Sequence, residues 1–409
     1  MIHIRRKLLA PYHYAWAVLS TLWYDFPSKR LTVIGVTGTK GKSSVAEMLY
    51  AILMAAGRKT ALAGTIRFVI GEESRPNLFK MTLPGRGFIQ KFLAEALTKQ
   101  CTYAVIEITS EAALQYRHLR LELDALVFTN LQKEHIESHG SMENYFRAKF
   151  SIGEALVHST KRPRHIVAKG DDTHGTAFLM LPVEKQIPFS LSEVTDTKTN
   201  EHGVSFSYKD TPFVLSLPGE FNILNALAAI KTAEAFGVPL ETCAQALREL
   251  THISGRVERI EAGQHFTAIV DYAHTPDSLT ALYRAFPTQR KICVLGNTGG
   301  GRDTWKRALM GRIADESCEK VILTNEDPYD EDPHSIVDAM KGGMQRTPEI
   351  IMDRREAIRA ALRAALPGDV VLISGKGTDP FIMGAKGSKI PWSDAQVVRE
   401  EIERLLAEF

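Results

Sequence analysis

The chain has 409 residues, which at roughly 100–200 residues per domain predicts two or three domains, each with its own core. Hydrophobic residues make up 44% and charged residues 24%, and this ordinary globular composition excludes disordered, collagen-like and fibrous chains. The 50 basic and 48 acidic residues leave a net charge of +2, so the charge of the whole protein does not attract nucleic acid or anionic membranes. We therefore expect no nucleic-acid partner.

The cysteine content points to a reducing compartment. The four cysteines are too few and too scattered for a disulfide framework or a zinc ribbon; they are Cys101, Cys243, Cys293 and Cys318. We expect all four to be buried or partly buried thiols in a cytoplasmic protein.

An apolar stretch of 16 residues, Leu8 to Trp23, follows three basic residues near the N-terminus. It contains Pro11 and His13 and has no clear small-residue cleavage site, which argues against a signal peptide. It is also shorter than the roughly 20 residues that span a bilayer as a helix. We interpret residues 1–30 as an N-terminal helical segment whose amphipathic helix packs on the protein's own body. The alternative is a helix that lies in a membrane interface with its basic flank among the headgroups.

Strands and helices are predicted to alternate from residue 31 onward. Leu31-Thr-Val-Ile-Gly-Val is a buried strand, the helical pattern of 43–56 stops at Gly57, and further strands are predicted at 60–63, 103–108 and 125–130. Such alternation indicates an α/β fold with a mostly parallel sheet covered on both faces. Polar clusters at 37–43, 107–111 and 129–135 follow three of these strands, at the edge where parallel sheets bind ligands.

In the second half of the chain, predicted strands and helices alternate again after an irregular stretch. Residues 160–217 are irregular and strand-rich, and 221–236 are predicted to form a helix. We place a domain boundary near 254–256, after which strands are predicted at 267–271, 291–296, 321–324 and 369–374 and a helix at 394–407. The predicted organisation is the segment 1–30, a central P-loop domain at 31–254 and a C-terminal Rossmann-like α/β domain at 255–409.

The strongest single motif is a glycine-rich loop between a predicted strand and a predicted helix, Gly35-Val-Thr-Gly38-Thr-Lys-Gly41-Lys42-Ser43-Ser44. Glycines let backbone N–H groups approach phosphate oxygens, and the helix N-terminus adds a favourable dipole. In such loops the lysine reaches the β- and γ-phosphates and the following hydroxyl binds Mg²⁺, so Lys42 and Ser43 are the candidates here. The usual pattern has a glycine at the position of Val36, whereas here the first glycine is Gly38. A phosphate loop alone fits a switch, a motor, a kinase or a ligase.

This variant loop resembles that of the Mur ligase superfamily, which includes the peptidoglycan amino-acid-adding ligases and the folylpolyglutamate synthases. Further motifs follow in the family's order between about residues 31 and 400, and they resemble most closely the branch that adds the third residue of the stem peptide. They are Glu107-Ile-Thr-Ser110, Phe128-Thr-Asn130, His135-Ile-Glu-Ser-His139-Gly, Tyr145-Phe-Arg-Ala-Lys149, Pro218-Gly-Glu-Phe-Asn222-Ile-Leu-Asn225, Gly255-Arg256-Val-Glu258, Asp271-Tyr-Ala-His274-Thr-Pro, Gly296-Asn-Thr-Gly-Gly-Gly-Arg302-Asp303-Thr-Trp-Lys306 and Gly375-Lys376-Gly377.

The resemblance implies an ATP-dependent ligase that activates a carboxylate as an acyl phosphate, which an amine then attacks. Because charge develops on phosphoryl and carboxyl oxygens in such a reaction, cations and N–H donors should dominate catalysis. Glu107 lies at a predicted strand end, which is a suitable position for a ligand of a hard metal ion beside Ser43. By resemblance, His135 is a ligand of a second Mg²⁺, and Lys149 is carbamylated, which makes it an anion near the metal ions. The candidate catalytic residues are Lys42, Glu107, His135, Lys149 and Arg302.

Further site residues are assigned by resemblance alone. The ATP-binding set comprises Gly38, Thr39, Lys40, Gly41, Lys42, Ser43, Ser44, Asn130, Asn222, Asn225, Arg256, Asp271, His274 and Lys306. Asn130 and either Asn222 or Asn225 match adenine-side positions, and Asp271 and His274 match positions near the ribose or base. Thr82, Ser110 and Arg117 match positions that hold the acceptor peptide. The candidates for the amino-acid side of the site are Gly375, Thr378 and Asp379, together with Asp327, Tyr329 and Asp330.

Three departures from the family pattern bear on the substrate. The family's tripeptide synthetases carry a UDP-binding domain before the loop, whereas only a short segment precedes the strand here, so we expect UDP recognition to differ. Glu326-Asp327-Pro328-Tyr329 stands in place of Asp-Asn-Pro-Arg, and the loss of the arginine removes bidentate carboxylate capture. Asp330 and Glu331 follow, and their negative charge favours an amino acid with a cationic side chain, such as lysine.

The third departure replaces Gly-Lys-Gly-His-Glu by Gly375-Lys376-Gly377-Thr378-Asp379, and Lys40 replaces the loop's asparagine. The main hypothesis is a ligase that acts on a muropeptide-like acceptor, with ATP, two Mg²⁺ sites and a carbamylated lysine, as a cytoplasmic monomer. The alternatives are the same chemistry on a folate-polyglutamate or polyglutamate acceptor, and a nucleotide-binding protein without ligase activity.

Overall fold

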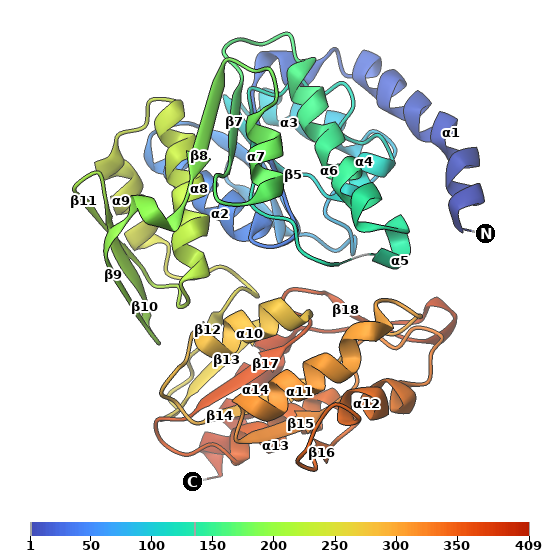
Figure 1. The fold of residues 1–409 in the computed structure, drawn as a ribbon, viewed down its shortest axis with the longest axis vertical. Helices are drawn as coiled ribbons and strands as arrows, with labels where there is room; N and C mark the ends of the chain where they lie inside the picture. The colour runs from blue at the N-terminus through green and yellow to red at the C-terminus, as the bar shows by residue number, and fades with distance from the viewer. Residues whose placement is uncertain (1, 135, 409) are drawn as a thin grey trace. The chain divides into compact units, whose positions relative to one another are not determined.

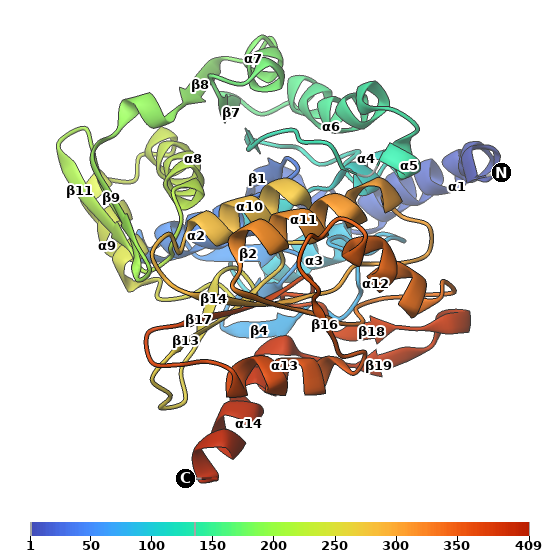
Figure 2. The same cartoon turned by 60° about the horizontal axis from the view of Figure 1, so that its bottom comes forward.

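The structure is a computed structural model that describes residues 2–134 and 136–408, with side chains from residue 9 onward. The chain divides into two compact units, shown in Figures 1 and 2. The first comprises Met1–Lys198, Ser205–Leu215 and Phe221–Leu250, and the second comprises Thr199–Val204, Ser216–Glu220 and Thr251–Phe409. Each unit is built on a largely parallel sheet with helices, and this confirms the predicted α/β class.

The first unit contains an eight-stranded sheet in the order β4-β3-β2-β5-β1-β6-β7-β8. Neighbours from β2 to β8 pair in parallel, and β3 and β4 extend the sheet as antiparallel edge strands. The strands are β1 (Thr32–Thr37), β2 (Thr60–Ala63), β3 (Arg67–Ile70), β4 (Glu73–Pro76), β5 (Tyr103–Glu107), β6 (Ala125–Phe128), β7 (His165–Lys169) and β8 (Lys185–Phe189).

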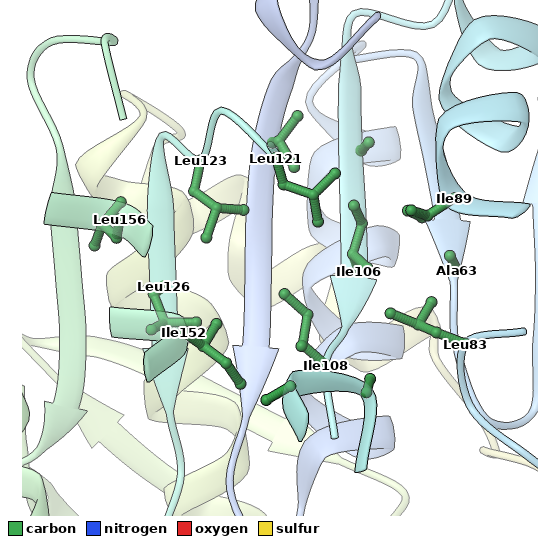
Figure 3. Close-up of a cluster of buried hydrophobic side chains, with 14 of the residues drawn as sticks. Ala63, Leu83, Ile89, Ile106, Ile108, Leu121, Leu123, Leu126, Ile152 and Leu156 are labelled. Atoms are coloured by element: carbon green, nitrogen blue, oxygen red, sulfur yellow. The ribbon is translucent and has the colours of Figure 1, made fainter. Parts of the chain in front are cut away.

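Helices cover both faces of this sheet because its central strands are apolar on both sides. On one face, alternate residues of β5 and β6 (Ile106, Leu126 and Phe128 among them) pack against α3, α4 and α6, as Figure 3 shows for part of this core. On the other face lie α2 and α8, which pack against each other. The helices are α1 (Ile2–Trp23), α2 (Lys42–Ala55), α3 (Phe88–Thr98), α4 (Ser110–Leu114), α5 (Ile136–His139), α6 (Met142–Val157), α7 (Thr173–Leu179), α8 (Phe221–Ala235) and α9 (Leu240–Glu249), with the 3-10 turns η1 (Pro27–Arg30) and η2 (Leu191–Glu193).

The N-terminal helix α1 differs from the predicted packing. Only its last turns are buried, at Ser20 and Thr21, whereas the large apolar side chains before and after them stay exposed. Helix α1 therefore contacts the protein's own body at Ser20 and Thr21, whereas the exposed large side chains do not take part in this packing. Within the described residues, no helix is both long enough and apolar enough to cross a membrane.

The second unit contains a six-stranded sheet in the order β12-β13-β17-β14-β15-β16, parallel except for the edge pair β12–β13. Alternate residues of β13, β14 and β17 pack with α13 and α14 in its core. Its elements are β12 (Glu258–Ile260), β13 (Thr267–Asp271), α10 (Pro276–Arg284), β14 (Lys291–Leu295), η3 (Thr304–Lys306), α11 (Arg307–Ser317), β15 (Lys320–Leu323), α12 (Pro333–Lys341), β16 (Glu349–Ile350), α13 (Arg354–Arg363), β17 (Val370–Ser374) and α14 (Asp394–Ala407).

Two small sheets complete the fold. β9 (Thr195–Asn200), β10 (Gly203–Tyr208) and β11 (Thr211–Leu215) form a three-stranded sheet within the stretch predicted to be strand-rich. β18 (Phe381–Met383) and β19 (Lys389–Pro391) form an antiparallel hairpin around η4 (Ala385–Gly387).

The cysteine prediction is wrong for one pair. Cys293 on β14 and Cys318 after α11 form a disulfide with a Cα–Cα distance of 6.2 Å, whereas Cys101 and Cys243 are buried thiols. α11 returns the chain to the sheet so that β15 pairs in parallel with β14, which brings Cys318 beside that strand. The two cysteines are 25 positions apart in the sequence, so only the crossover makes them neighbours.

Candidate active site

The phosphate loop lies between β1 and α2, as predicted, and its glycines are required by close contacts. Gly38 has a φ of +143°, and a Cβ there would lie 2.0 Å from Thr129 Oγ1. Gly41 has a φ of +81°, and a Cβ there would lie 2.3 Å from Asn225 Oδ1. The backbone can therefore follow this path only with glycine at both positions, and α2 begins directly after it at Lys42.

A chain of buried hydrogen bonds joins the first turn of α2 to the neighbouring strand. Ser43 Oγ donates to Glu107 Oε2 at 3.1 Å, and Glu107 lies at the carboxyl end of β5, where it is 1% exposed. Glu107 also accepts hydrogen bonds from Thr65 N at 2.8 Å and Thr65 Oγ1 at 3.0 Å. Thr65 Oγ1 lies 2.8 Å from Thr82 Oγ1, so Thr82, a predicted acceptor residue, is linked to Glu107.

These oxygen atoms fit a magnesium site. Mg²⁺ prefers oxygen ligands and is usually held by one or two carboxylates together with substrate phosphates, so a serine hydroxyl beside a single carboxylate at a phosphate loop is a suitable donor set. Among the residues that the structure describes, no cluster of three or more His, Cys, Asp or Glu side chains could hold a metal by itself. His135, the predicted ligand of a second ion, lies outside the described residues.

Lys149 on α6 is buried against the same loop. Its side chain is 1% exposed, and Nζ donates to the Gly38 carbonyl at 2.6 Å and lies 4.7 Å from the centre of the Tyr145 ring. Burial, and then the nearby Lys42 ammonium, hold the pKa of Lys149 well below its ordinary value. The structure thus brings Lys149 to the phosphate loop and favours its neutral amine.

Residues that follow β6 anchor the phosphate loop. Asn130 Oδ1 accepts from Lys40 N at 3.0 Å, and its Nδ2 donates to the Lys40 carbonyl at 3.1 Å. The Lys40 ammonium lies 3.2 Å from the Glu134 carboxylate, and Thr39 Oγ1 lies 3.0 Å from the Tyr145 hydroxyl. Asn130, which the resemblance puts beside adenine, is engaged here with the backbone of the phosphate loop and holds that loop in place.

The two α8 asparagines lie together on the other side of the loop. Both are buried, and Asn225 Nδ2 donates to Asn222 Oδ1 at 3.1 Å. Asn225 faces Gly41, which puts this pair beside the start of α2. Ser44, also buried, occupies the first turn of α2.

The remaining predicted acceptor residues also lie in the first unit. Ser110 is the first residue of α4, and its Oγ lies 3.1 Å from Nε2 of the buried His139. Arg117 donates to the Leu83 carbonyl and, at 2.5 Å, to Gln115 Oε1. Burial lowers the pKa of Arg117, which stays far above neutrality as for any guanidinium.

In the second unit, the predicted nucleotide residues lie at the carboxyl end of β13. Asp271 accepts from Val257 N and Ala273 N, both at 2.7 Å, and His274 Nδ1 lies 2.6 Å from the Tyr272 carbonyl. The Arg256 guanidinium stacks 4.7 Å above the Tyr272 ring. A Cβ on Gly255 would lie 2.6 Å from Thr378 N, so the Gly255-Arg256 turn touches the loop that contains Thr378.

The acidic loop after β15 is already engaged in ion pairs and hydrogen bonds. Arg307 donates to both oxygens of Glu331 at 2.6 and 2.9 Å, and this pairing lowers the pKa of Glu331 to about 2. Asp330 Oδ1 accepts from Lys386 N at 2.6 Å. Of the two carboxylates expected to select a cationic amino acid, Glu331 is therefore compensated by Arg307, whereas Asp330 accepts a hydrogen bond from a backbone N–H. Arg302 stacks 4.8 Å above the ring of Tyr329, and Lys306 is buried at the end of η3.

A buried charge cluster lies under that loop. Lys376 Nζ lies 2.9 Å from Asp327 Oδ1 and 3.6 Å from Asp379, and Asp327 Oδ1 also accepts from Met383 N at 2.8 Å. Oε1 of Glu326 accepts from Thr298, whereas its Oε2 has no hydrogen-bond partner among the described residues and faces Gly375. Burial raises the pKa of Glu326.

The structure gathers the predicted residues into one group in each unit. Sequence reasoning missed Thr65, Thr129, Glu134 and Tyr145, which complete the first group. Thr65, Thr129 and Glu134 follow strands of the parallel sheet, and that position is the signal that could have identified them. Tyr145 on α6 gave no such signal and was visible only as part of the motif that contains Lys149.

Comparisons with known proteins agree with this arrangement. The Mur ligase middle domain matches residues 36–233, and the Mur ligase glutamate ligase domain matches residues 255–377. A UDP-N-acetylmuramyl-tripeptide synthetase from Roseiflexus sp. (strain RS-1) is 37% identical over 96% of this chain and 82% of that protein. A UDP-N-acetylmuramoyl-L-alanyl-D-glutamate--2,6-diaminopimelate ligase from Caldanaerobacter subterraneus subsp. tengcongensis is 34% identical over 94% of this chain and 81% of that protein.

Solved structures show the same fold. One of a UDP-N-acetylmuramoyl-L-alanyl-D-glutamate--2,6-diaminopimelate ligase has a TM-score of 0.63 at 28% identity and covers 92% of this chain and 79% of its own. The Mycobacterium tuberculosis folylpolyglutamate synthase in complex with ADP has a TM-score of 0.69 at 15% identity and covers 96% of this chain and 94% of its own, which shows the fold alone. With both domain matches in order and a third of the residues shared over nearly the whole chain, this protein belongs to the Mur ligase family and is an ATP-dependent ligase.

Proposed function

We propose that this ligase joins the carboxylate of a muramoyl-dipeptide-like acceptor to the amino group of an amino acid, with ATP converted to ADP and phosphate. The observation that carries the proposal is the buried hydrogen bond between Ser43 and Glu107 at a phosphate loop that only glycine allows. It brings a hydroxyl, a carboxylate and the N-terminus of α2 to one point, which suits the terminal phosphates of a nucleotide.

The reaction has two balanced steps. First, an oxygen of the acceptor carboxylate attacks the γ-phosphorus of ATP, the bond to the ADP oxygen breaks, and an acyl phosphate forms. Second, the neutral amine attacks the carbonyl carbon, a tetrahedral intermediate forms, and phosphate leaves with the electron pair of the C–O bond while the nitrogen loses a proton. Both steps move negative charge onto oxygen atoms, so fixed cations and N–H groups lower their barriers.

The residues of the first unit have distinct tasks in this proposal. The backbone N–H groups of the loop hold the phosphates, and Lys42 neutralises charge on the transferred group. Ser43 and Glu107 hold Mg²⁺, which when bound acts as a Lewis acid on the phosphoryl oxygens. The Asn130 amide and the Thr129 hydroxyl, which donates to the Lys40 carbonyl at 2.6 Å, keep the loop in its binding conformation. Thr82, Ser110 and Arg117 are proposed to bind the acceptor.

We infer that Lys149 acts as a carbamate. Its depressed pKa provides the neutral amine that attacks CO₂, forming an N–C bond while one C=O bond becomes C–O⁻ and the nitrogen releases a proton. The product is an anion next to Lys42, where an ammonium would be repelled. A buried neutral amine is thereby replaced by an anion that the Lys42 cation can stabilise.

Residues of the second unit are proposed to act on the other reactants. Arg302 and Lys306 offer cations to the phosphates, Arg256, Asp271 and His274 hold the nucleoside, and Gly375, Thr378 and Asp379 receive the amino acid with Asp327, Tyr329 and Asp330. We expect a cytoplasmic reaction, where ATP is supplied, and a monomeric enzyme.

A phosphate-release assay tests the proposal. Muramoyl-dipeptide acceptors with and without UDP are each combined with lysine, diaminopimelate, ornithine or glutamate, and a folate acceptor with glutamate is included. We expect phosphate release that requires ATP, a muramoyl acceptor and one amino acid together, with the ligated peptide identified by mass spectrometry. Phosphate release whose rate does not depend on the acceptor or the amine would contradict ligase activity. Release only with the folate acceptor would support the alternative acceptor.

A further inference from the structure

Four large side chains in the described part of α1 are exposed on one face of the helix. Tyr12, Trp16, Leu19 and Trp23 are spaced three or four residues apart and form one face of the helix, which we call the outward stripe. Their exposed fractions are 44%, 40%, 60% and 84%. An ordinary surface helix has the reverse arrangement, with large apolar side chains buried and polar ones exposed.

Two small residues near the end of α1 make its closest contact with the first unit. Thr21 is fully buried and Ser20 nearly so, and their hydroxyls donate to the carbonyls of Ala17 and Trp16 in the same helix at 2.7 and 2.6 Å. A Cβ on Gly87, directly before α3, would lie 2.6 Å from Ser20 Cβ, so the end of α1 is closely packed there. The outward stripe is therefore not needed to attach the helix. Figures 1 and 2 show the N-terminal end of α1 projecting beyond the other helices of this unit.

The charge of this segment has one sign. Arg5, Arg6 and Lys7 lie within the first turns of α1, and the sequence has no acidic residue before Asp25. A cationic end next to a stripe rich in tryptophan and tyrosine suits a surface that is anionic outside and apolar just beneath. A bilayer with anionic headgroups has this profile, whereas a protein partner would need acidic side chains placed to match.

We propose that α1 binds the surface of an anionic lipid bilayer, with the outward stripe at the level of the headgroups and upper acyl chains and the positive charge of the segment attracted to the anionic lipids. The helix lies in the interface and does not cross it, in keeping with the finding that no described helix could span a membrane. This inference is independent of the ligase reaction, because none of its residues belongs to the proposed active site.

The proposal has a consequence for the acceptor side of the enzyme. The Tyr14 ring on α1 packs edge-on against Tyr116 at 6.1 Å, and burial, followed by the charge of Arg117, lowers the pKa of His13. Arg117 is a proposed acceptor residue. Binding of α1 to a bilayer would therefore hold the acceptor region of the first unit close to the membrane surface.

Co-sedimentation of the full-length protein with vesicles tests the proposal. The vesicles contain phosphatidylcholine alone or phosphatidylcholine with phosphatidylglycerol, and the variants are a stripe variant (Trp16→Ser, Leu19→Ser, Trp23→Ser) and a charge variant (Arg5→Gln, Arg6→Gln, Lys7→Gln). The control variant removes two exposed apolar side chains elsewhere, Met180→Ser and Leu366→Ser, whose exposed fractions are 79% and 58%.

We expect the wild type and the control variant to bind anionic vesicles, with a blue shift of tryptophan emission. The stripe variant should bind at least tenfold more weakly, and the charge variant should lose about fivefold per basic residue. High salt should weaken wild-type binding because the electrostatic part is screened. The stripe variant should unfold at nearly the same urea concentration as the wild type, since its three side chains are largely exposed.

Three results would overturn the proposal. The first is wild-type protein that sediments with neither kind of vesicle. The second is a wild-type dimer in sedimentation velocity that the stripe variant abolishes, which would assign the stripe to a second copy of the chain. The third is a stripe variant with clearly reduced stability, which would show that these residues pack on the protein itself.

Discussion

Individual lysines at the phosphate loop owe their properties to their surroundings. Lys40 is partly exposed and paired with Glu134, whereas Lys149 is fully enclosed and donates to a backbone carbonyl. Lys42 donates to the Thr39 carbonyl at 2.9 Å, so its ammonium stays at the loop. The same residue type is therefore paired at Lys40, proposed as a phosphate-binding cation at Lys42 and proposed as a site of modification at Lys149.

The role of Lys42 leads to the first prediction. Lys42→Ala removes the cation that faces the phosphates, and acceptor-dependent phosphate release should fall by on the order of 10²–10³. Lys91→Ala, which removes an exposed lysine on α3, is the matched control and should keep full activity. Equal activity in both variants would contradict the assignment of Lys42.

A second prediction concerns Lys149. Lys149→Ala removes the site of carbamylation and should abolish turnover, because the alanine side chain cannot supply the anion. Small carboxylates such as formate or acetate should partly restore the rate, since they provide an anion in the space left by the side chain. Turnover is measured by phosphate release across a range of carboxylate concentrations. Full activity without any additive would rule out the carbamate.

The third prediction concerns pH and the Glu331 carboxylate. Its folded-state pKa of about 2 lies below the ordinary value of 4.5, so its ion pair with Arg307 stabilises the fold above pH 4.5 and this stabilisation is lost as the pH falls towards 2. Glu331→Gln should therefore be less stable than the wild type at pH 7, and the difference should shrink below about pH 4.5. Urea unfolding of both proteins at pH 7 and below about pH 4.5 measures this difference in stability. A difference that does not change with pH would contradict the assignment.

At the scale of elements, the phosphate loop is held by its neighbours on both sides. Thr129 and Asn130 after β6 approach Gly38 and Lys40, and Asn225 on α8 approaches Gly41. β1 lies between β5 and β6 in the sheet, so the elements that flank it in space come from later in the chain. The loop conformation is thus a property of three strands and two helices together.

The fourth prediction compares two glycines that flank α2. Gly57→Ala replaces a residue with a φ of +70° and open space around it. The left-handed backbone alone should therefore lower the free energy of unfolding by about 1–2 kcal/mol. Gly38→Ala adds an overlap with Thr129 Oγ1 and should cost more than that, and it should also abolish ADP binding. Urea unfolding and titration calorimetry measure the two effects. A Gly38→Ala variant that binds ADP normally would exclude this loop as the phosphate site.

Among the described residues, each of the two units has its own buried hydrophobic core. The phosphate loop belongs to the first unit. A nucleotide that binds there should therefore raise the free energy of unfolding of that unit.

The fifth prediction uses this division. Calorimetry should resolve two unfolding transitions, and ADP with Mg²⁺ should move only one of them to a higher temperature. At a nucleotide concentration of 100 Kd, the free energy of unfolding of that unit should rise by about 2.7 kcal/mol. The Lys42→Ala variant should lose this shift. A nucleotide that stabilises the second unit alone, seen by hydrogen exchange of β13 and β17, would contradict the assignment of the loop.

The amino-acid sequence alone determined the fold class, most strand positions and the phosphate loop, because these depend on local patterns of apolar residues, glycine and helix starts. β2, β13 and α14 have the predicted bounds. The same local information identified Lys42, Ser43 and Glu107, since each lies directly at the end of a strand or the start of a helix.

Tertiary structure decided what depends on distant parts of the chain meeting in space. The disulfide between Cys293 and Cys318, the pairing of Glu331 with Arg307 and the burial of Lys149 all arise from crossovers that return the chain to a sheet. The outward stripe of α1 belongs to this group as well, because an apolar helical pattern does not tell which face meets the protein. Local patterns specify elements, whereas burial, charge compensation and exposure follow from how those elements pack.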